Sequence, residues 1–308
     1  METLKKISVI MLTYNREDLL ERMIQCILSQ TMTNFEFIIV DNGSEDKSGE
    51  IADKYAANDS RIIVVHKEKG NIGSGRNAGL DMATGEYIAF VDDDDFCESD
   101  YLEFLYELAI NTNADISICG ATDKAFDERY VMSAEEAMET LLWRKRFNVQ
   151  FPTKMIKRHL FNSCRFLDTG KYDDIYLMPR IIAKAKLVAY HGISKYHFNR
   201  HNNNVSAWTQ NHKLLDKTIL QEYLQVYRDR TEWLCDIFPN NARKWKYFEW
   251  SFMISMVEKI SRLKLEDCFL MCNEMKKILK MKKDEFLACS EILDFEKEWL
   301  EGSLINYE

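Results

Sequence analysis

Short apolar runs alternate with longer segments of helical spacing along the first 120 residues. The apolar runs predict buried strands at residues 7–12, 35–40, 61–65, 87–91 and 115–119. The segments between them predict helices at residues 17–29, 47–57, 77–82 and 101–111, the third preceded by a glycine-rich loop. Strands that alternate with helices indicate an α/β domain with a mostly parallel sheet flanked by helices.

Polar residues follow directly after three of the predicted strands. They are Thr13, Tyr14 and Asn15 after the first, Asp41 and Asn42 after the second, and Asp92, Asp93, Asp94 and Asp95 after the fourth. Sheets of this kind bind ligands beyond the carboxyl ends of their strands. We therefore expect these three groups to meet at one crevice.

The pattern changes at about residue 211. From there apolar residues recur at helical spacing as far as residue 300, with an aromatic-rich stretch at residues 245–260. Pro239, one of only three prolines in the chain, is expected to separate two helices. We therefore predict two domains, an α/β domain at residues 1–210 and a C-terminal α-helical domain at residues 211–308.

The composition narrows the functional classes. The 308 residues are 46% hydrophobic and 30% charged, with a net charge of −9, which argues against nucleic acid as a partner. The eight cysteines form no Cys-x-x-Cys pair and lie mostly in apolar runs, where a reduced cysteine behaves as a small hydrophobic residue. The chain opens into a strand-like run and contains no apolar stretch of about 20 residues. We therefore expect a cytoplasmic protein.

The four consecutive aspartates form the most informative cluster. An Asp-x-Asp sequence at the end of a strand lets two carboxylates share a divalent cation, and such hard oxygen ligands suit Mg²⁺ or Mn²⁺. The alternative is an acidic turn in solvent. The position after a buried strand, with the segment from Gly73 to Gly79 and its Arg76 upstream, favours a metal site at Asp94 and Asp92.

Four motifs together resemble family 2 glycosyltransferases of the GT-A fold, over residues 5–206. They are the first strand running into Thr13, Tyr14 and Asn15; the second running into Asp41, Asn42, Gly43 and Ser44; Gly73-x-x-Arg76-Asn77-x-Gly79; and Asp92-x-Asp94-Asp95. The resemblance implies a metal-dependent enzyme with a GT-A domain. It would move a sugar with inversion from a nucleotide sugar, expected to be a UDP-sugar, to a hydroxyl of a glycan or lipid-linked acceptor.

The resemblance also implies roles for individual residues. Asp41 and Arg76 would read uracil, because a carboxylate accepts from N3–H and a guanidinium donates to a carbonyl. Thr13 and Tyr14 would line the base, and Asp92 would contact the ribose or a metal-bound water. The other nucleotide-binding residues at the strand ends would be Asn15, Asn42 and Asp93. Two positions depart from the family pattern, which commonly has proline in place of Leu12 and aspartate in place of Asn42.

A later group of residues completes the implied site. Asp173 and Asp174 open a predicted helix that extends to about residue 185, and they resemble the Glu-Asp motif that supplies the catalytic base, here placed on Asp174. Two acids at a helix N-terminus can instead serve the helix dipole alone. Arg200 and Ser206 would lie over the diphosphate. His197 and His201 have the spacing of helical metal ligands, but no third ligand is evident, so we favour solvent or hydrogen-bonding roles for both, with His197 a weaker candidate for a metal or phosphate contact.

Other functions fit the sequence less well. The glycine segment is one residue too long for a dinucleotide-binding fingerprint, and no P-loop Gly-Lys-Ser/Thr is present. The main alternative is a transferase-like subunit that has lost activity and assists a partner enzyme. Because the metal and base carboxylates are retained, we favour an active enzyme.

The helical tail carries a basic segment at residues 276–283 and four of the six tryptophans, Trp233, Trp245, Trp250 and Trp299. One hypothesis is peripheral docking at the inner face of a membrane, near a lipid-linked acceptor. The other, which we favour, is an ordinary helical bundle with a solvated lysine face that serves as an oligomer contact.

Overall fold

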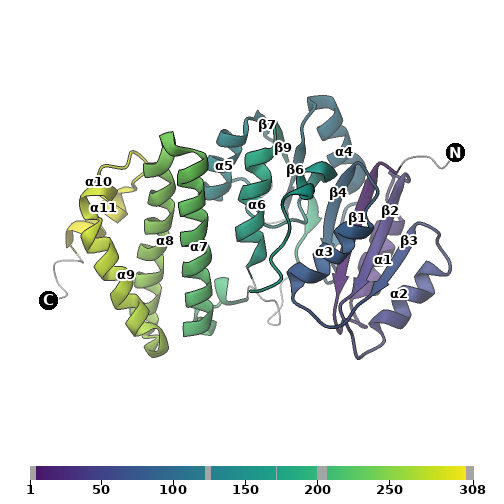
Figure 1. The fold of residues 1–308 in the computed structure, drawn as a ribbon, viewed down its shortest axis with the longest axis horizontal. Coiled ribbons are helices and arrows are strands. Elements are labelled where there is room, and N and C mark those ends of the chain that lie inside the picture. The colour runs from purple at the N-terminus through teal and green to yellow at the C-terminus, as the bar shows by residue number, and fades with distance from the viewer. Residues whose placement is uncertain (1–4, 122–125, 171, 200–206, 303–308) are drawn as a thin grey trace. The chain divides into compact units, whose positions relative to one another are not determined.

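The computed structural model describes residues 5–121, 126–170, 172–199 and 207–302. The chain divides into two compact units, Met1–Asn199 and Arg200–Glu308, here called the sheet unit and the helical unit. The sheet unit holds every described strand, and the helical unit is built from helices (Figure 1).

Nine strands form one mixed sheet in the order β3-β2-β1-β4-β8-β6-β9-β5, with β7 paired to β9. They are β1 (Ile7–Thr13), β2 (Phe35–Asp41), β3 (Ile62–His66), β4 (Tyr87–Asp92), β5 (Phe96–Cys97), β6 (Ile116–Ala121), β7 (Arg129–Met132), β8 (Lys154–Lys157) and β9 (Val188–His197). The ladders β1–β2, β1–β4, β2–β3 and β6–β9 are parallel. The ladders of β4 and β6 with β8, and of β5 and β7 with β9, are antiparallel.

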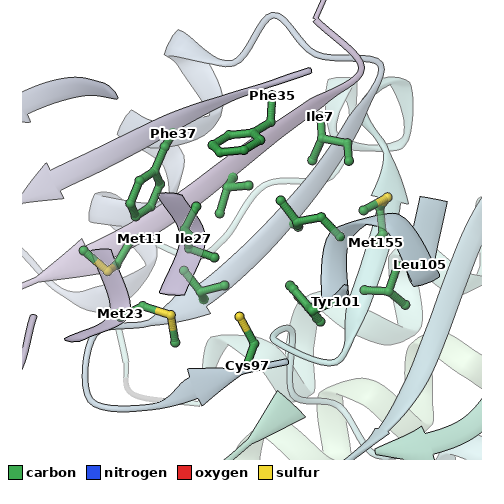
Figure 2. Close-up of a cluster of buried hydrophobic side chains, with 14 of the residues drawn as sticks. Ile7, Met11, Met23, Ile27, Phe35, Phe37, Cys97, Tyr101, Leu105 and Met155 are labelled. Carbon is green, nitrogen blue, oxygen red and sulfur yellow. The ribbon is translucent and has the colours of Figure 1, made fainter. Parts of the chain in front are cut away.

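Helices cover the sheet because its strands are apolar on both faces. The helices of the sheet unit are α1 (Leu20–Leu28), α2 (Ser48–Ala56), α3 (Ile72–Met82), α4 (Tyr101–Thr112), α5 (Ala134–Trp143) and α6 (Asp173–Lys184). On one face, alternate residues such as Ile7 and Phe35 pack with Met23 and Ile27 of α1 and with Tyr101 of α4 (Figure 2). All of these side chains are buried, so this face forms the main core of the sheet unit.

Helix α3 covers the opposite face and corrects one expectation. The glycine-rich stretch before residue 77 is not a loop but the first turns of α3. Gly75 and Gly79 allow the helix to approach β1, because an added Cβ would lie 2.2 Å from Leu12 Cδ1 and 2.4 Å from Ile10 Cγ2 respectively. These glycines are required for close packing, although glycine in a helix interior is otherwise unfavourable.

The predicted strands of the first 121 residues are confirmed, with ends displaced by one or two residues. The elements that the sequence did not predict are α5 and the strands β5, β7, β8 and β9. These four strands make the antiparallel ladders, while β6 and β9 pair in parallel like the strands β1 to β4, so the prediction of a mostly parallel sheet is confirmed with antiparallel strands added to it.

The described helical unit consists of α7 (Lys217–Ile237), α8 (Ala242–Leu263), α9 (Phe269–Met281), α10 (Lys283–Leu287) and α11 (Asp294–Gly302). Pro239 begins a short 3₁₀ turn between α7 and α8, as predicted. Trp245 and Trp250 are buried in the bundle, while Trp233 and Trp299 are partly exposed. Among the described helices, none is long and apolar enough to cross a membrane. All eight cysteines are free thiols.

Candidate active site

The carboxyl ends of β1, β2, β3 and β4 lie in one row at one edge of the sheet. The register pairs Thr13 with Asp41, and Asp41 with His66. On the other side of β1, Leu12 pairs with Asp92. The prediction that these strand ends gather at one edge is therefore confirmed.

Two loops at this edge are joined by hydrogen bonds. The backbone N–H of Asn15 donates to Ser44 Oγ at 3.0 Å, and its side-chain oxygen accepts from the N–H of Glu45 at 2.8 Å. The N–H of Arg16 donates to Ser48 Oγ at 2.8 Å. These groups bond to residues 44–48 and not within a helix. Helix α1 therefore begins at Leu20, three residues later than predicted. Asn15, with φ of 51°, is thereby fixed as part of the scaffold.

Asp41 is buried at the end of β2, and both of its carboxylate oxygens have partners. One accepts from the backbone N–H of Ser44 at 2.9 Å, and the other lies 3.1 Å from His66 Nδ1. His66 Nε2 lies 3.0 Å from Asp53, and the carboxylates of Asp53 and Asp41 raise the pKa of His66. His66 was missed from the sequence because the third strand was ended one residue early.

Asn42 holds the loop at residues 67–70 in place. Its amide nitrogen donates to the carbonyl of Gly70 at 2.9 Å, while its amide oxygen accepts from Lys67 Nζ at 2.9 Å and from the N–H of Gly70 at 3.2 Å. The side chain therefore needs both a donor and an acceptor. This requirement explains why asparagine replaces the aspartate that is usual in the resembled family.

Tyr14 lies beside the same loop. Lys69 Nζ donates to the Tyr14 hydroxyl at 2.5 Å and lies 4.4 Å from the centre of its ring. Tyr14 is only partly buried, so one part of its ring is available to a ligand above the strand ends. Thr13, by contrast, is 1% exposed and supports the site from below.

The acidic turn after β4 concentrates negative charge. Asp93, Asp94 and Asp95 are buried, while the carboxyl of Asp92 is 42% exposed. Burial raises the pKa of Asp93 to about 7 and that of Asp95 to about 8, with their acidic neighbours adding to both shifts. Removal from water and the charge of Asp94 also raise the pKa of Asp92, against the opposing effect of Arg76. A group of carboxylates with raised pKa values favours a bound cation.

The donor set fits Mg²⁺ or Mn²⁺ only in part. No group of three or more His, Cys, Asp or Glu side chains among the described residues is arranged to hold a metal ion by itself. Magnesium sites commonly use one or two carboxylates and take the other ligands from water and substrate phosphates. Asp92 and Asp94 fit that arrangement, in which the substrate completes the site.

Arg76 joins the acidic turn to a segment nearly 100 residues further along the chain. Its guanidinium lies 3.3 Å from Asp92 and 3.7 Å from Asp173, and the side chain is 13% exposed. Burial lowers the pKa of Arg76, but the charges of Asp173, Asp92 and Asp174 outweigh it, and the net shift is upward. Within the described residues, no hydrogen bond or ion pair joins Arg76 to Asp41, its predicted partner at uracil.

The α3 segment also positions the chain that leads into α6. Asn77 donates to the carbonyl of Phe166 at 2.9 Å and accepts from its N–H at 3.1 Å. Asn71 donates to the carbonyl of Leu167 at 3.0 Å. Gly73 permits this approach, since a Cβ there would lie 2.1 Å from the Leu167 oxygen. The glycines and asparagines of this motif thus hold residues 166–167 against α3, just before α6.

Asp173 and Asp174 begin α6, as predicted. Asp173 is 4% exposed, and burial raises its pKa while Arg76 opposes the shift. Burial, reinforced by the charge of Asp173, raises the pKa of Asp174 to about 6. Asp174 is therefore an ionised carboxylate near neutral pH that can still accept a proton, which suits a general base.

Comparison with known proteins agrees with this arrangement. The sequence profile described as "Glycosyl transferase family 2" matches residues 8–175, more than half of the chain.

The chain belongs to glycosyl transferase family 2. It is 32% identical over 219 residues to the glycosyltransferase GlyG of Streptococcus pneumoniae, a match that covers 65% of this chain and 72% of GlyG. It is 30% identical over 260 residues to the glycosyltransferase GlyA of the same organism, which covers 74% of this chain but only 37% of GlyA. The chain therefore spans little more than a third of the length of that relative.

A solved structure confirms the fold of this family 2 chain. A fragment of S. aureus TarS, crystallised in complex with UDP-GlcNAc, matches with a TM-score of 0.64 and 19% identity, covering 80% of this chain and 73% of the TarS chain. At that identity the likeness concerns the fold. It confirms the α/β architecture predicted from the sequence.

Four residues near the end of the predicted α/β domain were also considered from the sequence. Arg200 and Ser206 lie outside the described residues, as does His201. His197 ends the strand β9, where helical i, i+4 spacing does not apply, and its side chain has the hydrogen-bonding role that we favoured from the sequence. Its Nε2 lies 2.6 Å from Glu98, and its ring stacks on Phe96.

Two further polar residues of this family 2 chain were missed from the sequence. The Tyr196 hydroxyl accepts the backbone N–H of Asp92 at 3.0 Å and so holds the start of the acidic turn. Lys154, 1% exposed in β8, donates to Thr153 Oγ1 at 3.1 Å and to the carbonyl of Gln150. Burial lowers the pKa of Lys154 to about 7. Neither strand was predicted, so no sequence signal pointed to these side chains.

Proposed function

We propose that this chain transfers a sugar from a UDP-sugar to a hydroxyl of a glycan or lipid-linked acceptor, with inversion at the anomeric carbon. The observation that carries the proposal is the position of Arg76, whose guanidinium lies between Asp92 of the acidic turn and Asp173 of α6. The residues assigned to the donor and those assigned to the base thus belong to one cluster. The fold shared with TarS, which was crystallised with UDP-GlcNAc, supports UDP as the nucleotide.

Asp174 is the proposed general base. The acceptor oxygen would attack the anomeric carbon while the bond from that carbon to the diphosphate oxygen breaks, and Asp174 would take the proton of the hydroxyl. Its raised pKa of about 6 makes it a stronger base than an ordinary aspartate while leaving it ionised at neutral pH. The neighbouring Asp173 would position it, since Asp173 accepts the backbone N–H of Asp174 at 3.1 Å.

Asp41 and Arg76 are the proposed readers of uracil. Asp41 is already oriented by His66 and by the N–H of Ser44, which leaves a fixed carboxylate as the acceptor for N3–H. The two Arg76 contacts, at 3.3 Å and 3.7 Å, are longer than typical charge-assisted hydrogen bonds of about 2.7–2.9 Å. The guanidinium therefore keeps donor capacity for a ligand.

Asp94 and Asp92 would hold Mn²⁺ or Mg²⁺. The bound ion would supply positive charge next to the diphosphate leaving group. Asp93 would remain a supporting residue, since Arg16 Nε lies 3.7 Å from its carboxylate and burial raises its pKa to about 7. Arg200 and Ser206 complete the proposed diphosphate contacts from the sequence alone.

The acceptor and the cellular location belong to the same proposal. We place the reaction in the cytoplasm, where free thiols such as the eight of this chain persist. The helical unit would contact the acceptor, a second copy of the chain or the membrane surface. Its buried Trp245 and Trp250 fill the bundle core and are not available to a membrane.

A thermal-shift screen with UDP, GDP, CDP, NAD and ATP, with and without Mn²⁺, tests the proposal. We expect stabilisation by UDP that grows with Mn²⁺, and transfer from one member of a panel of UDP-sugars. Asp94→Ala should remove the Mn²⁺-dependent part, while Asp81→Ala, a carboxylate at the far end of α3, should not. Stabilisation by GDP or CDP alone would refute the uracil assignment. No response to any nucleotide would favour the inactive partner subunit.

A further inference from the structure

The helical unit contains a pocket that the proposed reaction does not use. Its volume is about 640 Å³, and α8, α9 and α11 each contribute to its wall. This volume lies within the range of about 300–1,000 Å³ that is usual for sites of small organic ligands. The pocket is only half enclosed, so an extended ligand could enter it from solvent.

The wall formed by α8 is polar apart from Val257. Ser255, Glu258, Lys259 and Arg262 stand at positions i, i+3, i+4 and i+7, which places them on one face of the helix. The apolar face of α8, with Met253, Ile254 and Ile260, is buried in the bundle, so the polar stripe runs along the opposite, more exposed side of the helix. Glu258 and Arg262 are exposed there, so the charged groups of this wall are accessible to a ligand from solvent.

Positive charge dominates this pocket. Lys259 and Arg262 from α8 and Lys276 from α9 line it, against the single carboxylate of Glu258. Arg262 forms no ion pair with any residue in the part of the chain that the structure describes. Burial and then the charges of Lys259 and Arg262 lower the pKa of His212, which shows the positive potential on this side of α8. An anionic ligand is therefore the complement of the pocket.

The pocket also has an aromatic residue in its wall. Trp299 of α11 lines the pocket with a half-buried side chain, and the hydroxyl groups of Ser255 and Ser261 line the same pocket. An indole offers an apolar face with one polar N–H, which suits the C–H face of a sugar ring, and hydroxyls suit its hydroxyl groups. Cations, hydroxyls and an aromatic face together fit a sugar that carries a negative charge.

We propose that this pocket binds an acidic oligosaccharide, in which carboxylate or phosphate groups pair with Arg262 and Lys276 while a sugar ring packs on Trp299. All the residues that line the pocket belong to the helical unit, and none of them is assigned a role in the proposed transfer. The proposal therefore concerns binding and does not depend on the transfer reaction.

Isothermal titration of the full chain in low salt, without nucleotide, tests the proposal. The probes are hexagalacturonate for carboxylate, a phosphorylated maltohexaose for phosphate, neutral maltohexaose and inorganic phosphate. We expect one or both acidic hexasaccharides to bind, and the one that binds more tightly shows whether the pocket prefers carboxylate or phosphate. The affinity should fall in about 0.5 M salt. Equal binding of neutral maltohexaose, or equal binding of inorganic phosphate, would overturn the proposal, as would no binding of either acidic probe.

Matched variants locate the binding. Arg262→Ala and Lys276→Ala should each weaken it about tenfold, as loss of a charge-assisted contact does. Lys277→Ala, which removes the exposed neighbour of Lys276 on α9, should change it less than about twofold. Trp299→Phe keeps an aromatic ring and should weaken binding less than Trp299→Ala. Equal effects of Lys276→Ala and Lys277→Ala, with melting temperatures unchanged, would refute the assigned site.

Discussion

The guanidinium of Arg76 lies 3.3 Å from Asp92 and 3.7 Å from Asp173, so one side chain of α3 joins the end of β4 to the start of α6. The three ring centres of Phe90, Phe151 and Phe166 lie 5.4–5.9 Å from the same guanidinium. The charge is thus held between carboxylates on one side and aromatic rings on the other. This arrangement makes Arg76 structural as well as a candidate for ligand binding.

Replacing Arg76 with methionine should destabilise the fold by about 3–5 kcal/mol, because the carboxylate of Asp173 would remain buried without a compensating charge. Adding Asp173→Asn should recover part of the loss, since the buried negative charge is then gone. Urea unfolding of the two single variants and the double variant measures the coupling. Strictly additive losses would show that the Arg76–Asp173 pair is not coupled.

Asp174→Asn should affect activity and stability in opposite directions. Loss of the general base should lower kcat by about 10²–10⁴-fold. Because burial raises the pKa of Asp174 to about 6, its ionised form destabilises the fold, and this cost appears as pH rises from 4 through 6. The variant should therefore be more stable than the parent at pH 8, by about 1–3 kcal/mol, and equal to it near pH 4. A residue with only a structural role would not show this opposition.

The pH dependence of the reaction follows from the same carboxyl. The base must be ionised to take a proton, so kcat/KM should fall as the pH drops through about 6, and not through the value near 4 of an ordinary aspartate. Initial rates between pH 4.5 and 8.5 would give this acidic limb. Since Asp173→Asn removes a neighbouring negative charge, it should move the limb to lower pH. A limb that stays in place would disprove the coupling between the two carboxyls.

Asn42→Asp tests the reason for the departure from the family pattern. Aspartate cannot donate to the carbonyl of Gly70, and its charge would face that oxygen at the present distance of 2.9 Å. We expect a loss of about 1–3 kcal/mol and weaker binding of UDP, because the loop that carries Lys69 beside Tyr14 would loosen. Thermal melts and nucleotide titration measure the two effects. Asn58→Asp, at an exposed asparagine after α2, serves as the control.

The sequence predicts the first half of the sheet well because its strands are apolar on both faces. The run at residues 35–40, apolar except for Glu36, is buried throughout, as expected for a short strand that is covered on both faces. The polar residues after each strand then identify the edge that carries the site. His66 escapes this reasoning only because the end of β3 was placed one residue too early.

The antiparallel half could not be predicted in the same way. β5 is two residues long, β7 has three exposed residues out of four, and β8 begins and ends with lysine. A lysine is expected to be exposed to solvent, but Lys154 is buried, and its ammonium group donates hydrogen bonds to Gln150 and Thr153. Such strands form because of their contacts with neighbouring strands in the sheet. These contacts cannot be inferred from the local pattern of hydrophobic and polar residues.

Gly73 gives the last test, because glycine there serves close packing and not flexibility. A Cβ at this position would lie 2.1 Å from the carbonyl oxygen of Leu167, a backbone atom that cannot turn away as a side chain could. Gly73→Ala should therefore push residues 166–167 away from α3, strain their pairing with Asn77, and cost about 1–3 kcal/mol. Since this segment leads into α6, Asp174 should move with it.

Enzyme kinetics can distinguish a displacement of Asp174 from a general loss of folded protein. A shift of about 1 Å in a catalytic group can lower a rate by about 10²-fold, so kcat of Gly73→Ala should fall far more than its affinity for UDP. Gly302→Ala, where no atom lies within 4 Å of the added Cβ, should leave stability within about 0.5 kcal/mol and kcat unchanged. If kcat and UDP affinity fell in equal proportion in Gly73→Ala, the glycine segment would be supporting the nucleotide site and not the placement of the base.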